Sequence, residues 1–450
     1  MDFSLKPEEV PQVKTSNRNI CTEIPVTDSI EIINKIHELE PNSLSGQLPL
    51  LWERAENFNV FDPYGNKWID FSSGVILANV GHRNKQVATN IKNQADINLH
   101  NYLFPSNIKY KFLSKLYAIV SKWDYDKIFL LTTGSEAIEN AIKLSCNYRN
   151  KTKADNSKQI YIVSFQNGFH GRTMGAQLAG GIQAQKHWIP IKTDSFINIP
   201  YPDNIFHSAD FRDFRRIVET YDISKIACVI IEGYQGGNIG VPPVDYIREL
   251  YHWCKTNGIL LIFDEVQSGF GRTGKFFSFE HFNIIPDIIC CGKGISSSLP
   301  LSCILTRKEI ADTFPIGSMS STHSGNPVCL AAGVGVLDEL ERHNIVQNAQ
   351  KMGEILQKRL KQLRNKYEIV KIVSGIGLAA GIHIYRNTTP NSELAYRIVE
   401  MCFKKGVLIC APVGYMNSVV KLTPPLTIAE DALIEGIDVI EESIQEVIEL

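Results

Sequence analysis

The chain has 450 residues, of which 44% are hydrophobic and 21% are charged, a balance typical of a globular protein long enough for two domains. Its 46 basic and 48 acidic side chains give a formal net charge of -2, which argues against binding to nucleic acid or to an anionic membrane. No apolar run approaches the roughly 20 residues of a membrane helix, and residues 1–19 lack the apolar core of a secretion signal, so we expect a cytoplasmic protein. The ten cysteines form no paired C-x-x-C motifs, which favours reduced, buried thiols over disulfides or a zinc site.

Residues 1–45 are mostly polar, carry prolines at 7, 11 and 25, and are predicted to form an irregular arm. Residues 60–71 alternate apolar and polar side chains on either side of a turn-forming stretch, which predicts a β-hairpin. From about residue 110, short apolar runs alternate with helical stretches. Strands are predicted at 127–133, 159–165, 225–233, 259–265, 287–294 and 301–306, and helices at 135–150 and 244–258.

These apolar runs lack strict alternation and are separated by helices, which argues for a mostly parallel sheet covered on both faces. Residues 325–342 are predicted to form a long helix that bridges to a smaller α+β domain. In the smaller domain we expect helices near 346–366, 391–405 and 428–449 and strands near 368–384.

Gly134 and Ser135 stand between a predicted strand and a predicted helix. Backbone amides at a helix N-terminus, together with the helix dipole, form an anion site, and a glycine lets a phosphate approach the backbone. Serine is also a favoured N-cap residue, so taken alone this position is better explained as a helix cap.

Asp264 ends a buried strand and leads into a glycine-rich loop, Gly269 to Lys275. The loop approaches the phosphate-loop pattern G-x-x-x-x-G-K-[ST], but Phe276 replaces the hydroxyl that binds magnesium. In α/β sheets ligands sit at the carboxyl ends of strands, where a carboxylate can hold a proton on a heterocyclic nitrogen. The alternative is a structural acid bonded to loop amides.

Lys293 lies between two glycines just past the next apolar strand. A lysine in a water-poor pocket loses some preference for its charged form and can form a Schiff base with a carbonyl. A surface lysine at a strand end is the simpler reading of any single lysine. A phosphate cradle, a nitrogen partner and a Schiff-base lysine are together the three fixtures that pyridoxal 5′-phosphate (PLP) requires.

These segments resemble those of the class III (subgroup II) aminotransferases of PLP fold type I, in particular the 4-aminobutyrate and ω-amino acid aminotransferases. The resemblance runs from about residue 45 to the carboxyl end, in the family's order. The motifs are YGNKWIDFSSG with NVGH (64–82), TGSEAIENAIKL (133–144), GFHGRT (168–173), IIEGYQGG (230–237), IFDEVQSGFGRTGKFFSFEHFNIIPDIICCGKG (262–294), STHSGNP (321–327) and LTPPLTI (422–428).

The resemblance implies a large PLP-binding domain with a mostly parallel seven-stranded sheet flanked by helices, plus a smaller α+β domain. We expect the large domain at 81–335, with residues 1–80 forming the arm and part of the small domain and residues 336–450 completing it. The family also implies a homodimer with shared active sites, or a tetramer.

The resemblance further implies a role for each matching position. Lys293 carries the cofactor as a Schiff base, and Asp264 keeps the pyridine nitrogen protonated. Gln267 is expected to approach the ring hydroxyl, and Val266 and Phe169 to press on the two ring faces. Gly134 and Ser135 are expected to bind the phosphate, and Thr322 the phosphate of the neighbouring subunit. Glu232 is expected to lie near the cofactor.

Arg172 in GFHGRT is the main substrate clue, because the arginine at this place in ω-amino acid enzymes holds the carboxylate far from the amine. Two positions depart from the family pattern. Gly237 replaces the glutamate that gates a second arginine, and Lys421 stands where that arginine precedes PPLTI. Lysine can pair with a carboxylate but lacks the guanidinium fork, so pyruvate or an unusual donor becomes possible.

We therefore expect a transaminase that moves an amino group from an ω-amino acid or amine to a 2-oxo acid acceptor. An amino-acid racemase or epimerase on the same scaffold is the alternative, because some relatives return the proton to the substrate carbon. A phosphate-loop ATPase and a catalytically silent homologue are disfavoured by Phe276 and by the intact pair Lys293 and Asp264, respectively.

Overall fold

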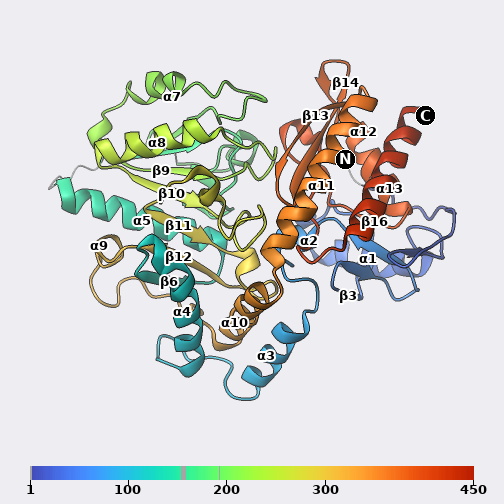
Figure 1. Ribbon diagram of the computed structural model, residues 1–450, viewed down its shortest axis with the longest axis horizontal. Helices are drawn as coiled ribbons and strands as arrows, with labels where there is room; N and C mark the ends of the chain where they lie inside the picture. The colour runs from blue at the N-terminus through green and yellow to red at the C-terminus, as the bar shows by residue number, and fades with distance from the viewer. Residues whose placement is uncertain (1–2, 154–158, 192, 450) are drawn as a thin grey trace. The chain divides into compact units, whose positions relative to one another are not determined.

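The computed structural model describes residues 3–153, 159–191 and 193–449. It divides the chain into two compact units (Figure 1). One comprises the described residues up to Asn84 together with those from Gln347 onward, and the other runs from Lys85 to Val346. Within the described residues, no helix is long and apolar enough to cross a membrane.

The unit from Lys85 to Val346 is built on a seven-stranded sheet, as the sequence predicts. One strand pairs antiparallel with both of its neighbours, and all other neighbouring strands pair parallel. The strand order is β6 (Lys127–Leu131), β12 (Ser302–Thr306), β11 (Ile288–Cys291), β10 (Leu260–Asp264), β9 (Ile226–Glu232), β7 (Tyr161–Phe165) and β8 (Phe196–Ile199), with β12 the antiparallel strand.

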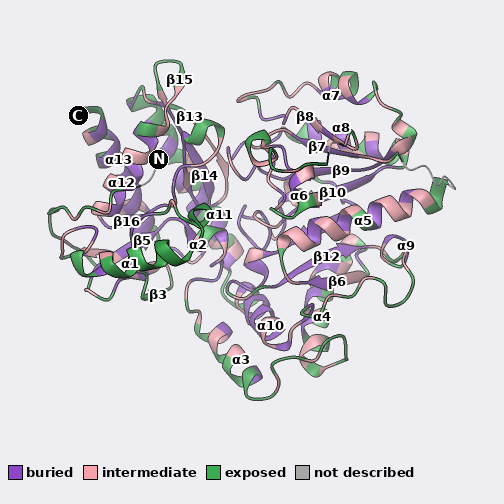
Figure 2. Ribbon diagram, turned by 180° about the vertical axis from the view of Figure 1, so that it is seen from behind, coloured by how far each residue is buried: buried purple, intermediate pink, exposed green. Residues whose placement is uncertain are grey.

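Helix α5 (Gly134–Lys153) packs against β9, β10, β11 and β12 and lies over the strands in Figure 2. Its Ala137, Ile138 and Ala141 meet apolar side chains such as Ile230 and Ile262 in one buried cluster. Strand residues alternate between the two faces, and β9 and β10 are buried along their whole lengths, so these strands have cover on both sides. The continuous apolar runs in the sequence are the direct consequence.

The remaining helices of this unit pack around the sheet or against one another. Helix α8 (Val244–Asn257) ends at Gly258, whose φ of +65° is the left-handed conformation that glycine adopts readily at a helix C-terminus. The others are α3 (Lys85–Ala95), α4 (Asn107–Val120), α6 (Met174–Ala179), α7 (Phe211–Val218), α9 (Lys308–Ala311) and α10 (Pro327–Arg342).

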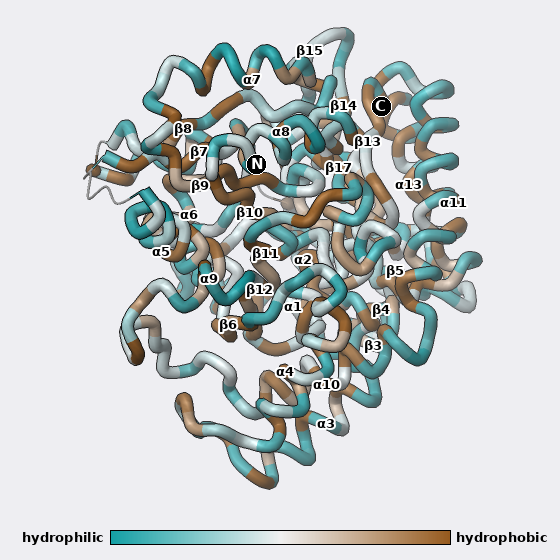
Figure 3. Tube along the Cα trace, turned by 60° about the vertical axis from the view of Figure 1, so that its left-hand side comes forward, coloured by the Kyte–Doolittle hydropathy of each residue, from teal (hydrophilic) through white to brown (hydrophobic). Residues whose placement is uncertain are grey.

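The second unit combines two small sheets with helices that carry alternating hydrophilic and hydrophobic bands, as α13 (Glu430–Glu449) does in Figure 3. The predicted hairpin is confirmed: β4 (Asn59–Phe61) and β5 (Lys67–Asp70) pair antiparallel. The other elements are β1 (Val13–Lys14), β2 (Asn19–Ile20), β3 (Arg54–Glu56), β13 (Val370–Ile376), β14 (Ala379–Arg386), β15 (Thr389–Pro390), β16 (Val407–Leu408), β17 (Val419–Leu422), α2 (Ser73–Ile76), α11 (Ile345–Lys366) and α12 (Ser392–Lys404).

The prediction of an irregular arm over 1–45 is wrong for part of that segment, because α1 (Thr27–Leu39) is a regular helix. The prolines at 7, 11 and 25 precede the helix and Pro41 follows it, so no proline interrupts the helix interior. Ile30, Ile33 and Ile36 recur at helical spacing, but only Ser29 and Ile33 of this helix are buried, so the apolar stripe is narrow.

Candidate active site

The carboxyl ends of three neighbouring strands bring the predicted acids and the lysine to one edge of the sheet. Asp264, the last residue of β10, stands opposite Glu232 on β9 and Cys290 on β11. Lys293 follows the end of β11 by two residues. Because parallel strands end at the same edge, side chains far apart in sequence meet there.

A cavity of about 130 Å³ lies at this edge. Most of the predicted cofactor residues line it, from strand ends, the start of α5 and the loop that follows β7. Its lining consists of Gly134, Ser135, Phe169, His170, Gly171, Asp264, Val266, Gln267 and Lys293.

Asp264 is held by two partners. Its Oδ2 lies 2.7 Å from Nδ1 of His170, and its Oδ1 accepts a hydrogen bond from the Val266 N–H at 3.0 Å. Burial by itself lowers the pKa of His170, but the hydrogen bond and the charge of Asp264 raise it, and the net direction is upward. This pairing therefore favours a protonated imidazole at His170.

Sequence reasoning assigned no role to His170. The available signal was its place in GFHGRT, directly after the aromatic residue expected on the cofactor ring. Both side chains of the pair are almost completely buried, so their charges interact with little screening by water.

Glu232 lies behind the cavity and organises two loops through backbone amides. Its Oε2 accepts from the Phe169 N–H at 3.1 Å, and its Oε1 accepts from the Gly236 N–H at 2.9 Å. Burial raises the pKa of Glu232 to about 7, the positive charge of His170 opposes the rise, and the charge of Asp264 adds to it.

Lys293 is partly buried and adopts a φ of +44°, which is unusual for a residue other than glycine. Burial lowers the pKa of its amine, while the nearby charges of Asp264 and Glu232 act in the opposite direction. The result is an amine that is more readily deprotonated than a lysine in water, as nucleophilic attack on a carbonyl requires.

Gly134 and Gly171 lie where the backbone of the cavity wall is most crowded. A Cβ on Gly134 would lie 2.8 Å from Cγ1 of Val266, and a Cβ on Gly171 would lie 2.2 Å from Oγ of Ser135. Gly171 also has a φ of +128°, which side chains disfavour. The start of α5 can therefore lie against Val266 only because residue 134 has no side chain.

The glycine-rich loop after Asp264 is organised by Glu265 and not by a phosphate-binding helix. Oε1 of Glu265 accepts from the Ser278 hydroxyl at 2.7 Å and from the Phe279 N–H at 3.0 Å. Its Oε2 accepts from the Ser278 N–H at 3.0 Å. Lys275 is exposed, and the chain continues into a short 3-10 helix. Glu265 therefore binds the loop through hydrogen bonds, whereas Asp264 lines the cavity.

Besides Glu232, three predicted residues do not line this cavity. Arg172 is exposed, and its guanidinium carbon lies 5.9 Å from the centre of the Phe169 ring. Thr322 is exposed on the turn before α10. Lys421 belongs to the other unit, on β17 opposite Gly381 of β14.

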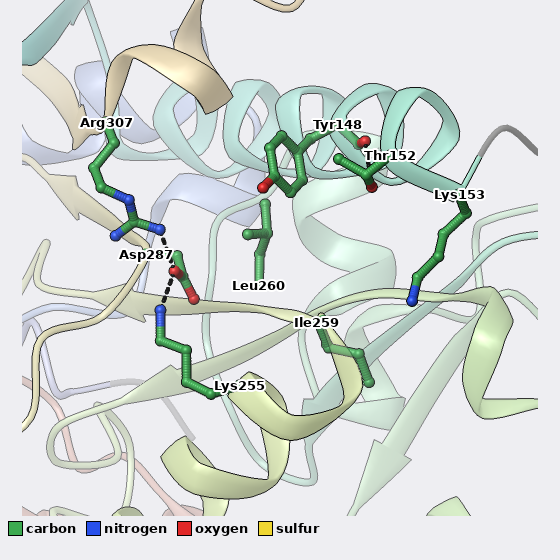
Figure 4. A pocket seen from close by; sticks show the side chains of 9 residues that line it. Tyr148, Thr152, Lys153, Lys255, Ile259, Leu260, Asp287 and Arg307 are labelled. Carbon is green, nitrogen blue, oxygen red and sulfur yellow. Dashed lines mark hydrogen bonds and ion pairs between the residues drawn. The ribbon is translucent and has the colours of Figure 1, made fainter.

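A second cavity, of about 250 Å³, lies at the opposite end of the strands, near the start of β10 (Figure 4). Its cations Lys255 and Arg307 are both paired with the buried carboxylate of Asp287. Asp287 also accepts from the Leu261 N–H at 2.9 Å. These ion pairs and this hydrogen bond connect the ends of neighbouring elements. No residue predicted for the active site lines this second cavity.

The residues of the first cavity fit PLP. They supply an amine with a lowered pKa, an acid fixed by two partners, an aromatic and an aliphatic side chain, and a helix start free of a Cβ. Among the described residues, no group of three or more metal-ligating side chains is present.

The comparisons with known proteins agree with this chemistry. The sequence matches the family described as aminotransferase class-III over residues 42–444. A 4-aminobutyrate aminotransferase from Mycobacterium leprae is 29% identical, with 94% of this chain and 97% of that one covered. A leucine/methionine racemase from Thermococcus litoralis is 31% identical, with 93% and 96% covered. An amine transaminase from an uncultivated Pseudomonas species, solved in its PLP-bound form, has a TM-score of 0.83 at 26% identity, with 88% and 95% covered. The chain belongs to the class III aminotransferases, and its cofactor is pyridoxal 5′-phosphate.

Proposed function

We propose that this enzyme moves an amino group from an ω-amino acid or amine of the 4-aminobutyrate type to a 2-oxo acid. The observation that carries the proposal is the position of Arg172, which does not line the cavity but whose guanidinium carbon lies 5.9 Å from the ring of Phe169, a lining residue of the cavity that also contains Lys293. A cation there suits a donor whose carboxylate is remote from its amine.

Each cavity residue has a defined task in this proposal. Lys293 would be the covalent attachment point, and its released amine would take the proton from the donor's amine-bearing carbon and deliver it to the cofactor carbon, which its lowered pKa favours. Asp264 would keep a proton on the ring nitrogen, and His170 holds Asp264 in place. When bound, PLP supplies an electron sink for the pair left on the deprotonated carbon.

The other residues hold and orient the cofactor. Phe169 and Val266 would contact the two faces of the ring, and Gln267 would bind its hydroxyl. Gly134 and Ser135 hold the phosphate at the start of α5, where backbone amides and the helix dipole favour an anion. Glu232 fixes the Phe169 backbone through the bond it accepts, so it acts on the ring through Phe169.

The choice of 2-oxo acid depends on the two departures from the family pattern. Gly237 carries no carboxylate to gate a second cation, and Lys421 is the cation we assign to the acceptor's α-carboxylate. Lysine binds as a point charge without bidentate geometry. Pyruvate is therefore as good a candidate acceptor as 2-oxoglutarate.

Amino-acid racemisation is the second candidate, and the similarity to the Thermococcus litoralis racemase is the observation that favours it. Both reactions begin with the same proton removal by Lys293. They differ in whether the proton returns to the substrate carbon or to the cofactor carbon.

We further propose a homodimer in which Thr322 reaches the partner's phosphate. An apolar surface supports this proposal: Ile97 is 77% exposed, Leu99 is 63% exposed and Phe104 is 72% exposed. The Asn326 side chain donates to the Leu99 carbonyl oxygen at 2.8 Å, so this surface adjoins the turn that carries Thr322. Large exposed apolar patches mark protein interfaces.

The test is a panel of donors offered to the purified, PLP-loaded enzyme while its violet absorbance is followed. We expect 4-aminobutyrate, β-alanine or a related ω-amine to bleach the band, and a 2-oxo acid to restore it. If only α-amino acids bleach the band, the assignment of Arg172 is wrong. If an α-amino acid exchanges its α-proton for deuterium without losing its amine, the enzyme is a racemase.

A further inference from the structure

The loop that joins β7 to α6, residues 168–173, is held at successive residues by other elements. Its Phe169 N–H donates to Glu232 on β9, and His170 pairs with Asp264 on β10. The Arg172 N–H donates to Oγ of Ser135 on α5 at 3.4 Å. We call this anchored segment the Arg172 loop. It contains the candidate carboxylate ligand Arg172 and three residues that line the cavity, Phe169, His170 and Gly171.

Glu139 on α5 anchors the far end of the Arg172 loop with one carboxylate oxygen. Its Oε1 accepts from the Thr173 hydroxyl at 2.7 Å, from the Gly175 N–H at 2.8 Å and from the Ala176 N–H at 3.1 Å. The Thr173 side chain does not cap α6, so the amides at the start of that helix are satisfied by Glu139 from a different helix.

Residue 175 is a glycine because the carboxylate occupies the space beside it. A Cβ on Gly175 would lie 2.3 Å from Oε2 of Glu139. The contact between α5 and the start of α6 thus depends on Glu139 on one helix and on a residue without a side chain, Gly175, on the other. Hydrogen bonds to a carboxylate are stronger than those between neutral groups.

The backbone of Arg172 is consequently fixed to α5 on both sides, by Ser135 before it and by Glu139 after it. Ser135 is at the phosphate end of the cavity, and Glu139 is one helical turn further along the same face of α5. We propose that Glu139 is a positioning residue, which sets where the Arg172 guanidinium lies relative to the cofactor and thereby sets affinity for the donor's carboxylate. This inference rests on the proposed function, which assigns that carboxylate to Arg172.

The experiment uses the PLP-loaded enzyme and whichever ω-amino donor bleaches its absorbance, with butyrate as a competing carboxylate that has no amine. The variants are Arg172→Ala, Glu139→Ala and Glu139→Gln, with Asn140→Ala as the matched control. Asn140 is the next residue on α5, and its side chain donates only to the Glu136 carbonyl oxygen within the helix among the bonds we find for it.

Arg172→Ala tests the proposed function first, because it must weaken inhibition by butyrate. If it does not, the carboxylate site is elsewhere and the proposed function fails irrespective of Glu139. Given that effect, we expect Glu139→Ala to raise the butyrate inhibition constant and the donor KM roughly tenfold, with kcat at saturating donor changed by no more than about threefold. Glu139→Gln retains the accepting oxygen and should stay within about threefold of the wild type, as should Asn140→Ala.

Hydrogen exchange of the substrate-free enzyme gives a readout independent of turnover. In Glu139→Ala the amides of Arg172, Gly175 and Ala176 should exchange roughly tenfold faster, while the strands of the sheet keep their protection. Two results would overturn the inference. One is a Glu139→Ala variant that lowers kcat but leaves butyrate inhibition unchanged. The other is a Glu139→Gln variant as impaired as Glu139→Ala, since the accepted hydrogen bonds would then not be what positions Arg172.

Discussion

His170 Nδ1 lies 2.7 Å from Asp264 Oδ2, and both side chains are almost entirely buried. This contact places a cation behind the carboxylate that we assign to the ring nitrogen. It also fixes the direction in which the other oxygen points, because Oδ1 accepts from the Val266 backbone.

Replacing His170 with alanine should therefore impair the chemistry more than the binding of the donor. Removing His170 takes away one of the two groups that hold the buried carboxylate of Asp264 in place. We expect kcat to fall about 10- to 100-fold with a smaller change in KM, measured by steady-state kinetics at several donor concentrations. A His170→Ala enzyme with wild-type kcat would show that Asp264 does not depend on this pair.

The raised pKa of Glu232 predicts how the free energy of unfolding changes with pH. Its pKa is about 7 in the folded protein, above the ordinary value of 4.5, so the folded state binds the proton more tightly than the unfolded state does. The contribution of this group to the free energy of unfolding is thus largest below pH 4.5 and is lost as the pH rises to about 7. The lost contribution is on the order of 3 kcal/mol.

The measurement is denaturant unfolding of wild type and Glu232→Gln between pH 5 and 8. The variant should be less stable at every pH, because an amide oxygen can replace only one of the two oxygens that accept from Phe169 and Gly236. Its stability should nevertheless fall less steeply with rising pH than that of the wild type. Parallel curves for the two proteins would refute the raised pKa.

Gly134→Ala should weaken cofactor binding through a steric effect. The new Cβ would lie 2.8 Å from Cγ1 of Val266, so either the start of α5 or the Val266 side chain must move. Overpacking of this kind costs about 1 to 3 kcal/mol, which corresponds to roughly a 5- to 150-fold rise in the dissociation constant for PLP.

The matched control for Gly134→Ala is the double variant Gly134→Ala with Val266→Ala. Removing the two methyl groups of Val266 removes the clash, so equilibrium dialysis should show PLP affinity partly restored relative to Gly134→Ala alone. No recovery in the double variant would mean that residue 134 acts through its backbone and not through Val266.

The sequence was most informative for buried strands, where burial on both faces restricts the residue types to apolar ones. Strands such as β9 and β10 are apolar on both faces, so their position in a parallel sheet could be predicted, and Asp264 and Lys293 follow as residues at strand ends. Strand β8 was missed because it has only four residues and is buried at alternate positions, a signal too short to separate from a loop.

The tasks of the neighbouring polar residues could not be read from spacing. Nothing in the letters distinguishes Asp264, which lines the cavity, from Glu265, whose oxygens bind Ser278 and Phe279 thirteen and fourteen residues later. Likewise, the partnership of His170 with Asp264 joins residues 94 positions apart and depends on how β7 and β10 are ordered in the sheet. Such relationships arise from the fold and become visible only in three dimensions.

The central claim is that Lys293 is the residue that carries the cofactor. Borohydride reduction of the PLP-loaded enzyme, followed by proteolysis and mass spectrometry, tests it directly. The account predicts one modified peptide, with the added mass on Lys293, and no modified peptide from a Lys293→Ala variant. An adduct on a different lysine of the wild-type enzyme, or an unmodified Lys293 in fully loaded protein, would contradict it.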